Sequence, residues 1–119
     1  MPRFEPGQVW TYRTRPDEEV SRVIVCRVDS HETDNAIIHI FVEGVAIAGA
    51  HTAISHAPIC QKALRESVLS LESMRESLPG YEEGYKTWKT SYDEGDAGVF
   101  TISVAECVEG IEEAWVKGR

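Results

Sequence analysis

The sequence predicts an α+β fold: a three- to four-stranded antiparallel sheet, formed by an N-terminal meander, with two or three helices from the C-terminal half packed on one face. One observation behind this prediction is that residues 8–47 hold three runs rich in β-branched and aromatic residues, separated by polar links. Another is a change of period after residue 59, where apolar residues recur every three or four positions. The length of 119 residues indicates one domain, residues 1–119. A small barrel made by the meander is the alternative fold.

The three runs define the expected strands. They are Gln8–Thr14, Val20–Val28 and Asn35–Ile47. The third run is expected to be the central strand because both of its faces are apolar. One face carries Ile38, Ile40 and Val42, and the other carries Ile37, His39 and Phe41. Short polar links favour antiparallel pairing, and Gly44 indicates a bulge or bend in the third run.

The second half is expected to be helical. After a loop at Gly49–Pro58, the spacing predicts a long helix over Ile59–Leu78. Its apolar stripe is Cys60, Leu64, Val68, Leu71 and Met74. A second stripe at helical spacing is Tyr81, Tyr85, Trp88 and Tyr92. Val99–Ile102 is a candidate fourth strand, and the capping-box spacing of Ser103 and Glu106 predicts the start of the last helix.

The net charge of −8, from 20 acidic and 12 basic residues, limits the classes of partner. A field of this sign repels phosphate backbones and anionic lipids, so neither nucleic-acid nor membrane binding is expected. It favours a basic protein partner. No apolar run approaches the roughly 20 residues of a membrane span, and residues 1–7 lack the apolar segment of a signal peptide. A cytoplasmic location is therefore expected.

No cofactor or metal site is expected from motifs. Cys26, Cys60 and Cys107 form no C-x-x-C pair, and we expect reduced, buried thiols. The sequence contains no P-loop, no G-x-G-x-x-G, no H-E-x-x-H and no G-x-S-x-G. His51 and His56 have loop spacing rather than the helical spacing of a zinc pair. No catalytic residue is assigned, and an enzyme is the less favoured class.

Two surfaces are candidates for binding a protein partner. Tyr85 and Trp88 belong to the aromatic stripe, and aromatic residues often anchor interfaces. Glu109, Glu112 and Glu113 form an acidic face on the last helix that would attract a basic partner. The simpler interpretations are that the stripe faces the core and that the acidic face is solvated.

A second candidate site is a ligand pocket near His39, His56 and Cys60. Cys60 is expected at a helix N-terminus, which lowers the pKa of a thiol, and His56 precedes it by four residues. This pocket requires the three side chains to converge in space. The simpler interpretation is that His39 is a core histidine and Cys60 a packed thiol.

Four stretches, taken together, resemble a family of small uncharacterised bacterial proteins: Phe4–Tyr12 (F-E-P-G-Q-V-W-T-Y), Ile54–Ile59 (I-S-H-A-P-I), Glu83–Trp88 (E-G-Y-K-T-W) and Gly98–Glu106 (G-V-F-T-I-S-V-A-E). The resemblance implies a single domain and a bacterial cytosolic source, and it transfers no site residue because the family has no established activity.

Three functional hypotheses follow. The first is a non-enzymatic protein-binding module, of the immunity or antitoxin type, that inhibits a basic bacterial toxin. The alternatives are a small-molecule binder or minor enzyme using the His39, His56 and Cys60 pocket, and a structural subunit of a homodimer or larger homo-oligomer. An exposed sheet edge or the Trp115 end of the last helix would join the copies in that last case.

Overall fold

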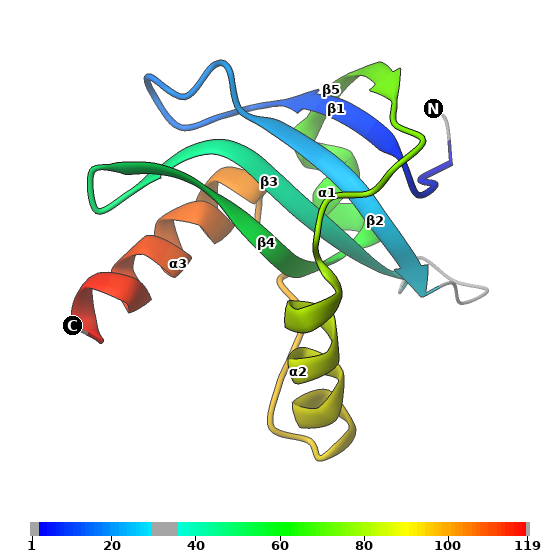
Figure 1. Ribbon diagram of the computed structural model, residues 1–119, viewed down its shortest axis with the longest axis vertical. Helices are drawn as coiled ribbons and strands as arrows, with labels where there is room; N and C mark the ends of the chain where they lie inside the picture. The colour runs from blue at the N-terminus through cyan, green and yellow to red at the C-terminus, as the bar shows by residue number, and fades with distance from the viewer. Residues whose placement is uncertain (1–2, 30–35, 119) are drawn as a thin grey trace.

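Five antiparallel strands form one sheet in the order β4-β3-β2-β1-β5 (Figure 1). The computed structural model describes residues 3–29 and 36–118, so most of the expected loop at 29–35 lies outside the described residues. The strands are β1 (Gln8–Tyr12), β2 (Arg22–Asp29), β3 (Ile37–Ile47), β4 (Ala50–Cys60) and β5 (Val68–Met74). The helices are α1 (Gln61–Ser67), α2 (Glu82–Asp93) and α3 (Val104–Lys117). The α+β prediction is confirmed, but the expected strand count of three to four is wrong.

Strand β4 occupies the stretch that was expected to be the loop Gly49–Pro58. It pairs with β3 from Ile47↔Ala50 to Ile37↔Cys60. The hairpin turns through Ala48 and Gly49, whose φ angles of 52° and 84° are both positive. Two such residues are what a tight hairpin with the right-handed strand twist requires. The strand state of β4 therefore comes from its turn and its partner rather than from β-forming residues of its own.

Strand β5 replaces the second half of the helix expected over Ile59–Leu78. Helix α1 ends at Ser67, and the chain then pairs antiparallel with β1. Val68 lies opposite Tyr12 and Leu71 opposite Trp10, so β5 carries an extra residue between these pairs. Such a bulge puts residues three apart on the same face of a strand. The three-residue spacing of Val68 and Leu71 therefore comes from the bulge, although the same spacing is also typical of one face of a helix.

The main core lies between one face of the sheet and helices α1 and α3. Ile38, Ile40 and Val42 of β3 belong to it, as predicted, together with Leu64 of α1 and Val108 of α3. A smaller cluster on the opposite face consists of Val9, Ile24 and Cys26, with Phe41 and Tyr81 packed against it. Tyr81 precedes α2, which lies well away from α3 (Figure 1). The two faces are thus covered by different helices.

The link between α2 and α3 is fastened to the outer edge of β4. The expected strand Val99–Ile102 is reduced to one parallel bridge between Phe100 and Ile59. The Phe100 amide donates to the Pro58 carbonyl at 2.9 Å, and the Cys60 amide donates to the Phe100 carbonyl at 2.9 Å. Pro58 itself has no amide hydrogen, and an edge strand tolerates this.

Helix α3 begins where the sequence predicts. The Ser103 hydroxyl accepts from the Glu106 amide at 3.2 Å, and the Glu106 carboxylate accepts from the Ser103 amide at 3.1 Å. This capping box satisfies two donors of the first turn. Among the described residues, no helix combines the length and the apolar character needed to cross a membrane.

Candidate functional site

Asp29, His39 and His56 form a hydrogen-bonded chain across three strands. His39, in the middle of β3, is fully buried at 0% exposure. Its Nε2 lies 2.8 Å from Oδ2 of Asp29 at the end of β2, and its Nδ1 lies 2.9 Å from Nε2 of His56 in β4. Both ring nitrogens of the buried histidine therefore have a partner, as a buried polar side chain requires.

Two bulges place Asp29 and His56, the ends of this hydrogen-bonded chain, on the same face of the sheet as His39. Val25 pairs with Ile40 but Arg27 pairs with His39, so β2 has one extra residue at this point. Without the bulge, Arg27 and Asp29 would share the core face of Val25, because side chains alternate along a strand. The bulge instead turns both toward the opposite face. Bulges often re-aim side chains in this way next to functional sites.

The bulge in β4 acts in the same way on His56. Ile40 lies opposite Ala57 and Val42 opposite Ile54, so three residue steps in β4 match two in β3. Ile54 and Ala57 both belong to the main core, which leaves His56 free to face the other side. There its ring stacks on His39, with ring centroids 5.1 Å apart and planes inclined by 16°.

Helix α2 covers the two histidines with aromatic rings. Tyr85 and Trp88 each meet the His39 ring edge to face, at centroid distances of 4.9 and 5.0 Å. The guanidinium of Arg27 lies 4.6 Å above the Tyr85 ring on the solvent side of the same group. The Trp88 indole N–H donates to the Gly98 carbonyl at 2.8 Å, which fixes the ring. These two members of the predicted aromatic stripe thus face the sheet.

The hydrogen-bonded chain of Asp29, His39 and His56 has a defined protonation pattern at neutral pH. Burial lowers the pKa of His39, and burial together with the proximity of His39 lowers the pKa of His56 to about 4. Burial opposes ionisation of Asp29, but the hydrogen bond from His39 and the neighbouring Arg27 outweigh it and lower the pKa of Asp29. Both imidazoles are therefore neutral and the carboxylate is ionised.

This pattern fixes the tautomers. The Asp29 carboxylate accepts from Nε2–H of His39, so Nδ1 of His39 must accept from Nε2–H of His56. Nδ1 of His56 is left with a lone pair, and no described residue donates to it. The low pKa of His56 means that this nitrogen stays unprotonated at neutral pH and can accept a hydrogen bond.

A pocket of about 430 Å³ opens beside the Asp29 end of the chain. We call it the α2 pocket. It is lined by Arg27, Val28, Asp29, Ile37, Tyr85, Trp88, Lys89 and Tyr92. Among the described residues, its walls therefore combine three aromatic rings with two cationic side chains, and the one carboxylate group is that of Asp29, which ends the chain of Asp29, His39 and His56.

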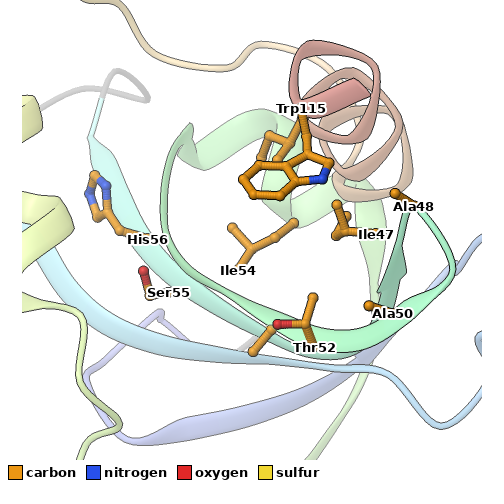
Figure 2. Close-up of a pocket in the computed structure, with 10 residues that line it drawn as sticks. Ile47, Ala48, Ala50, Thr52, Ile54, Ser55, His56 and Trp115 are labelled. Carbon is orange, nitrogen blue, oxygen red and sulfur yellow. The ribbon is translucent and has the colours of Figure 1, made fainter. Parts of the chain in front are cut away.

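A second hollow, the α3 groove, lies between the β3–β4 hairpin and α3 (Figure 2). Its volume is about 490 Å³, and its lining is Ile47, Ala48, Ala50, Thr52, Ala53, Ile54, Ser55, His56, Ile111 and Trp115. Trp115 stands over Ile54 in Figure 2, and it is 58% exposed. The His56 ring is turned away from Trp115 at the margin of the groove (Figure 2). The groove is mainly apolar and separate from the α2 pocket.

The structure joins two of the three residues of the predicted ligand pocket. His39 and His56 are in direct contact, whereas Cys60 packs against the main core at the start of α1. Sequence reasoning missed Asp29 and Arg27, which complete the site. The alternation R-V-D at the end of β2 was a signal for two polar side chains on one face, but the expected strand ended at Val28.

The predicted acidic face of α3 is partly used inside the protein. Arg15 binds the carboxylates of Glu112 and Glu109 at 2.8 and 3.3 Å, and it also pairs with Glu18. Glu113 is exposed, and no described residue forms an ion pair with it. Of the acidic residues expected to attract a partner, Glu113 is therefore the one most available.

Neither known relatives nor a metal-binding arrangement identifies the site. No protein-family model, curated protein or solved structure matches this chain. Within residues 3–29 and 36–118, no three or more His, Cys, Asp or Glu side chains are grouped so as to hold a metal ion.

Proposed function

We propose that this protein binds a small molecule in the α2 pocket. The observation that carries the proposal is the fully buried His39, held between Asp29 and His56 beneath Tyr85 and Trp88 and beside that pocket. The α2 pocket differs from the pocket predicted from the sequence, because its lining includes Asp29 but none of His39, His56 and Cys60, and Cys60 packs against the main core.

The energetics of His39 support this function over a purely structural one. Burying a polar ring is unfavourable unless every polar atom finds a partner, and an aliphatic residue of similar volume would fill the position without that requirement. Groups with shifted pKa values that gather beside a pocket are common at functional sites. Here three such groups, Asp29, His39 and His56, are linked in one chain.

The three tryptophans provide a direct test by NMR. Trp88 lines the α2 pocket, Trp115 lines the α3 groove, and Trp10 is buried at 2% exposure. The protein would be titrated with a panel of small aromatic acids, amines and neutral compounds while the indole N–H signals are recorded. We expect at least one compound to shift the Trp88 signal and leave that of Trp10 unchanged. A panel that leaves Trp88 and the amides around the α2 pocket unchanged at millimolar concentration would refute the proposal.

The α3 groove supports a second candidate function, the non-enzymatic protein-binding module. Trp115 and Val116 are 58% and 52% exposed, and exposed apolar residues beside a groove are typical of interaction surfaces. With a net charge of −8, the partner would be a basic protein, such as a bacterial toxin neutralised in the cytoplasm by an immunity-type inhibitor. A homodimer joined through this end of α3 is the competing arrangement.

Affinity capture would test this second candidate. The wild-type protein and a Trp115→Ala variant would be used as baits in parallel, at low and at physiological salt, with gel filtration to detect a dimer. We expect a single basic protein to be retained by the wild type and lost by the variant. If the same proteins bind both baits, the groove is not the interface.

A further inference from the structure

The polar groups around the α2 pocket differ in the hydrogen-bonding capacity that they have left. Both carboxylate oxygens of Asp29 are occupied, one by His39 at 2.8 Å and one by Nε of Arg27 at 3.0 Å. Among the described residues Arg27 donates only through Nε, so its two terminal nitrogens remain as donors. The Lys89 ammonium donates to Asp93 at 2.6 Å and has two further N–H groups.

The free donors of the described lining are therefore cationic, and each oxygen of Asp29, the one acidic residue among those lining residues, already accepts one charge-assisted hydrogen bond. The cations are also accessible, with side chains of Arg27 and Lys89 that are 47% and 44% exposed. Arg27 is further oriented from two sides, by the Asp29 carboxylate and by the Tyr85 ring at 4.6 Å. A guanidinium held in a fixed plane favours bidentate binding of a carboxylate or phosphate group.

The apolar part of the lining is flat. Trp88 and Tyr92 stack with ring centroids 4.6 Å apart and planes inclined by 28°, and Tyr92 remains 40% exposed. Such a stacked pair offers a surface on which another aromatic ring packs well. Ile37 adds an aliphatic contact from the sheet.

We infer that the α2 pocket takes a planar aromatic molecule that carries an anionic group. The anionic group binds Arg27 and Lys89, and the ring packs on Trp88 and Tyr92. The overall charge of −8 repels such a ligand at long range, so its recognition depends on these two neighbouring cations. This inference depends on the proposed small-molecule function and specifies the class of ligand.

Three probes with the same ring separate charge from shape: 2-naphthoate, 2-naphthamide and 2-naphthylmethylammonium. Each would be titrated into the protein at low ionic strength, with the Trp88 indole N–H signal as the readout. We expect naphthoate to bind roughly 25- to 100-fold more tightly than the amide, because its carboxylate gains one charge-assisted hydrogen bond from each of the two cations. Arg27→Gln and Lys89→Gln should each reduce the naphthoate affinity by roughly five- to tenfold and leave the amide affinity unchanged. Lys86→Gln is the matched control, since Lys86 is an exposed lysine of α2 outside the pocket lining.

The outcomes distinguish this inference from the proposed function. Equal binding of the three probes at Trp88, or tightest binding of the ammonium, would overturn the ligand class while small-molecule binding in the α2 pocket stands. Naphthoate that shifts Trp115 instead of Trp88 would place the anion site in the α3 groove and would also overturn the inference. If no probe and no member of the wider panel shifts Trp88, the proposed function itself fails. The Lys89→Gln variant keeps the test valid if Arg27→Gln disturbs the fold, because Lys89 pairs only with the exposed Asp93 among the described residues.

Discussion

The backbone of Gly84 in α2 packs directly against the side chain of His56 in β4. A Cβ atom on Gly84 would lie 2.8 Å from Cβ of His56, closer than real Cβ contacts allow. We therefore expect Gly84→Ala to lower the free energy of unfolding by about 1–2 kcal/mol, as overpacked sites do. The shift should appear in urea denaturation followed by tryptophan fluorescence, because Trp88 lies on the displaced helix.

Gly110→Ala is the control for this substitution. Gly110 lies within α3, and a Cβ atom added to it would meet nothing within 4 Å, so only the helix propensity changes there. We expect it to raise the free energy of unfolding by about 0.5–1 kcal/mol. A Gly84→Ala variant that gains stability to the same extent would show that α2 does not rest on His56.

Acidification should destabilise the protein through His56. Its pKa of about 4 in the folded protein lies below the ordinary value of 6.5, so the unfolded chain binds more protons between these two values. The contribution of His56 is therefore complete above pH 6.5 and is lost as the pH falls toward 4. We expect the wild type to lose on the order of 2 kcal/mol more than His56→Gln over this interval. Urea denaturation at several pH values measures the difference.

His51→Gln provides the comparison, since His51 is exposed in the same strand. The free energy of unfolding of the His51→Gln variant should change with pH as that of the wild type does. If the free energy of unfolding of His56→Gln depends on pH as that of the wild type does, His56 does not carry the acid sensitivity.

Arg15 should be one of the most important charged residues for stability. Its guanidinium makes a two-point ion pair with Glu18, at 2.8 and 2.7 Å, and the Glu18 side chain is only 8% exposed. Removing Arg15 leaves this carboxylate without its cation, which is strongly unfavourable for a buried charge. We expect Arg15→Met to lower the free energy of unfolding by about 3 kcal/mol. Arg22→Met, which removes a more exposed pair with Glu72, should lower it by about 0.5 kcal/mol.

Reversing the charge of Glu112 should destabilise the protein more than reversing the charge of Glu113. Glu112→Lys places a cation against Arg15 and removes the acceptor of the Ala48 amide, so the melting temperature should fall. Glu113→Lys, at an exposed position, should change the free energy of unfolding by less than about 0.5 kcal/mol. Thermal denaturation of the two variants gives the comparison. Equal destabilisation by both would contradict the assignment of Glu112 to an internal ion pair.

Local pattern was sufficient to predict the parts of the fold that depend on a residue and its immediate neighbours. The alternation of Ile38, Ile40 and Val42 identified the core face of β3, and the capping box at Ser103 identified the start of α3. Gly44 indeed lies at an irregularity in the β3–β4 register, with φ of 74°. Strand β4 was missed because its state depends on a hairpin partner, and few of its residues favour strands by themselves.

Only part of the candidate site could be predicted, because the positions of its side chains also depend on how the strands pair. His39 and His56 were both singled out, but a bulge in β4 is what aims His56 at His39. A bulge in β2 likewise brings Asp29 to the chain, whereas Cys60 stays outside it. Bulges arise from the pairing of two strands, so the sequence of either strand alone does not locate them. Where they occur, simple alternation gives the wrong face.

Helix α2 forms the roof of the site although none of its residues is fully buried. Its attachment consists of half-buried aromatic rings, the Phe100 bridge and the Gly84 contact, while the sheet beneath it has most of its apolar side chains in the core. An element with so little buried surface is expected to detach by local unfolding at a free energy well below that of global unfolding. The amide protons of α2 should then exchange with solvent much sooner than those of β3. The wall of the α2 pocket that carries Tyr85, Trp88 and Tyr92 would then be the first part of the protein to open, while the strands beneath it stay folded.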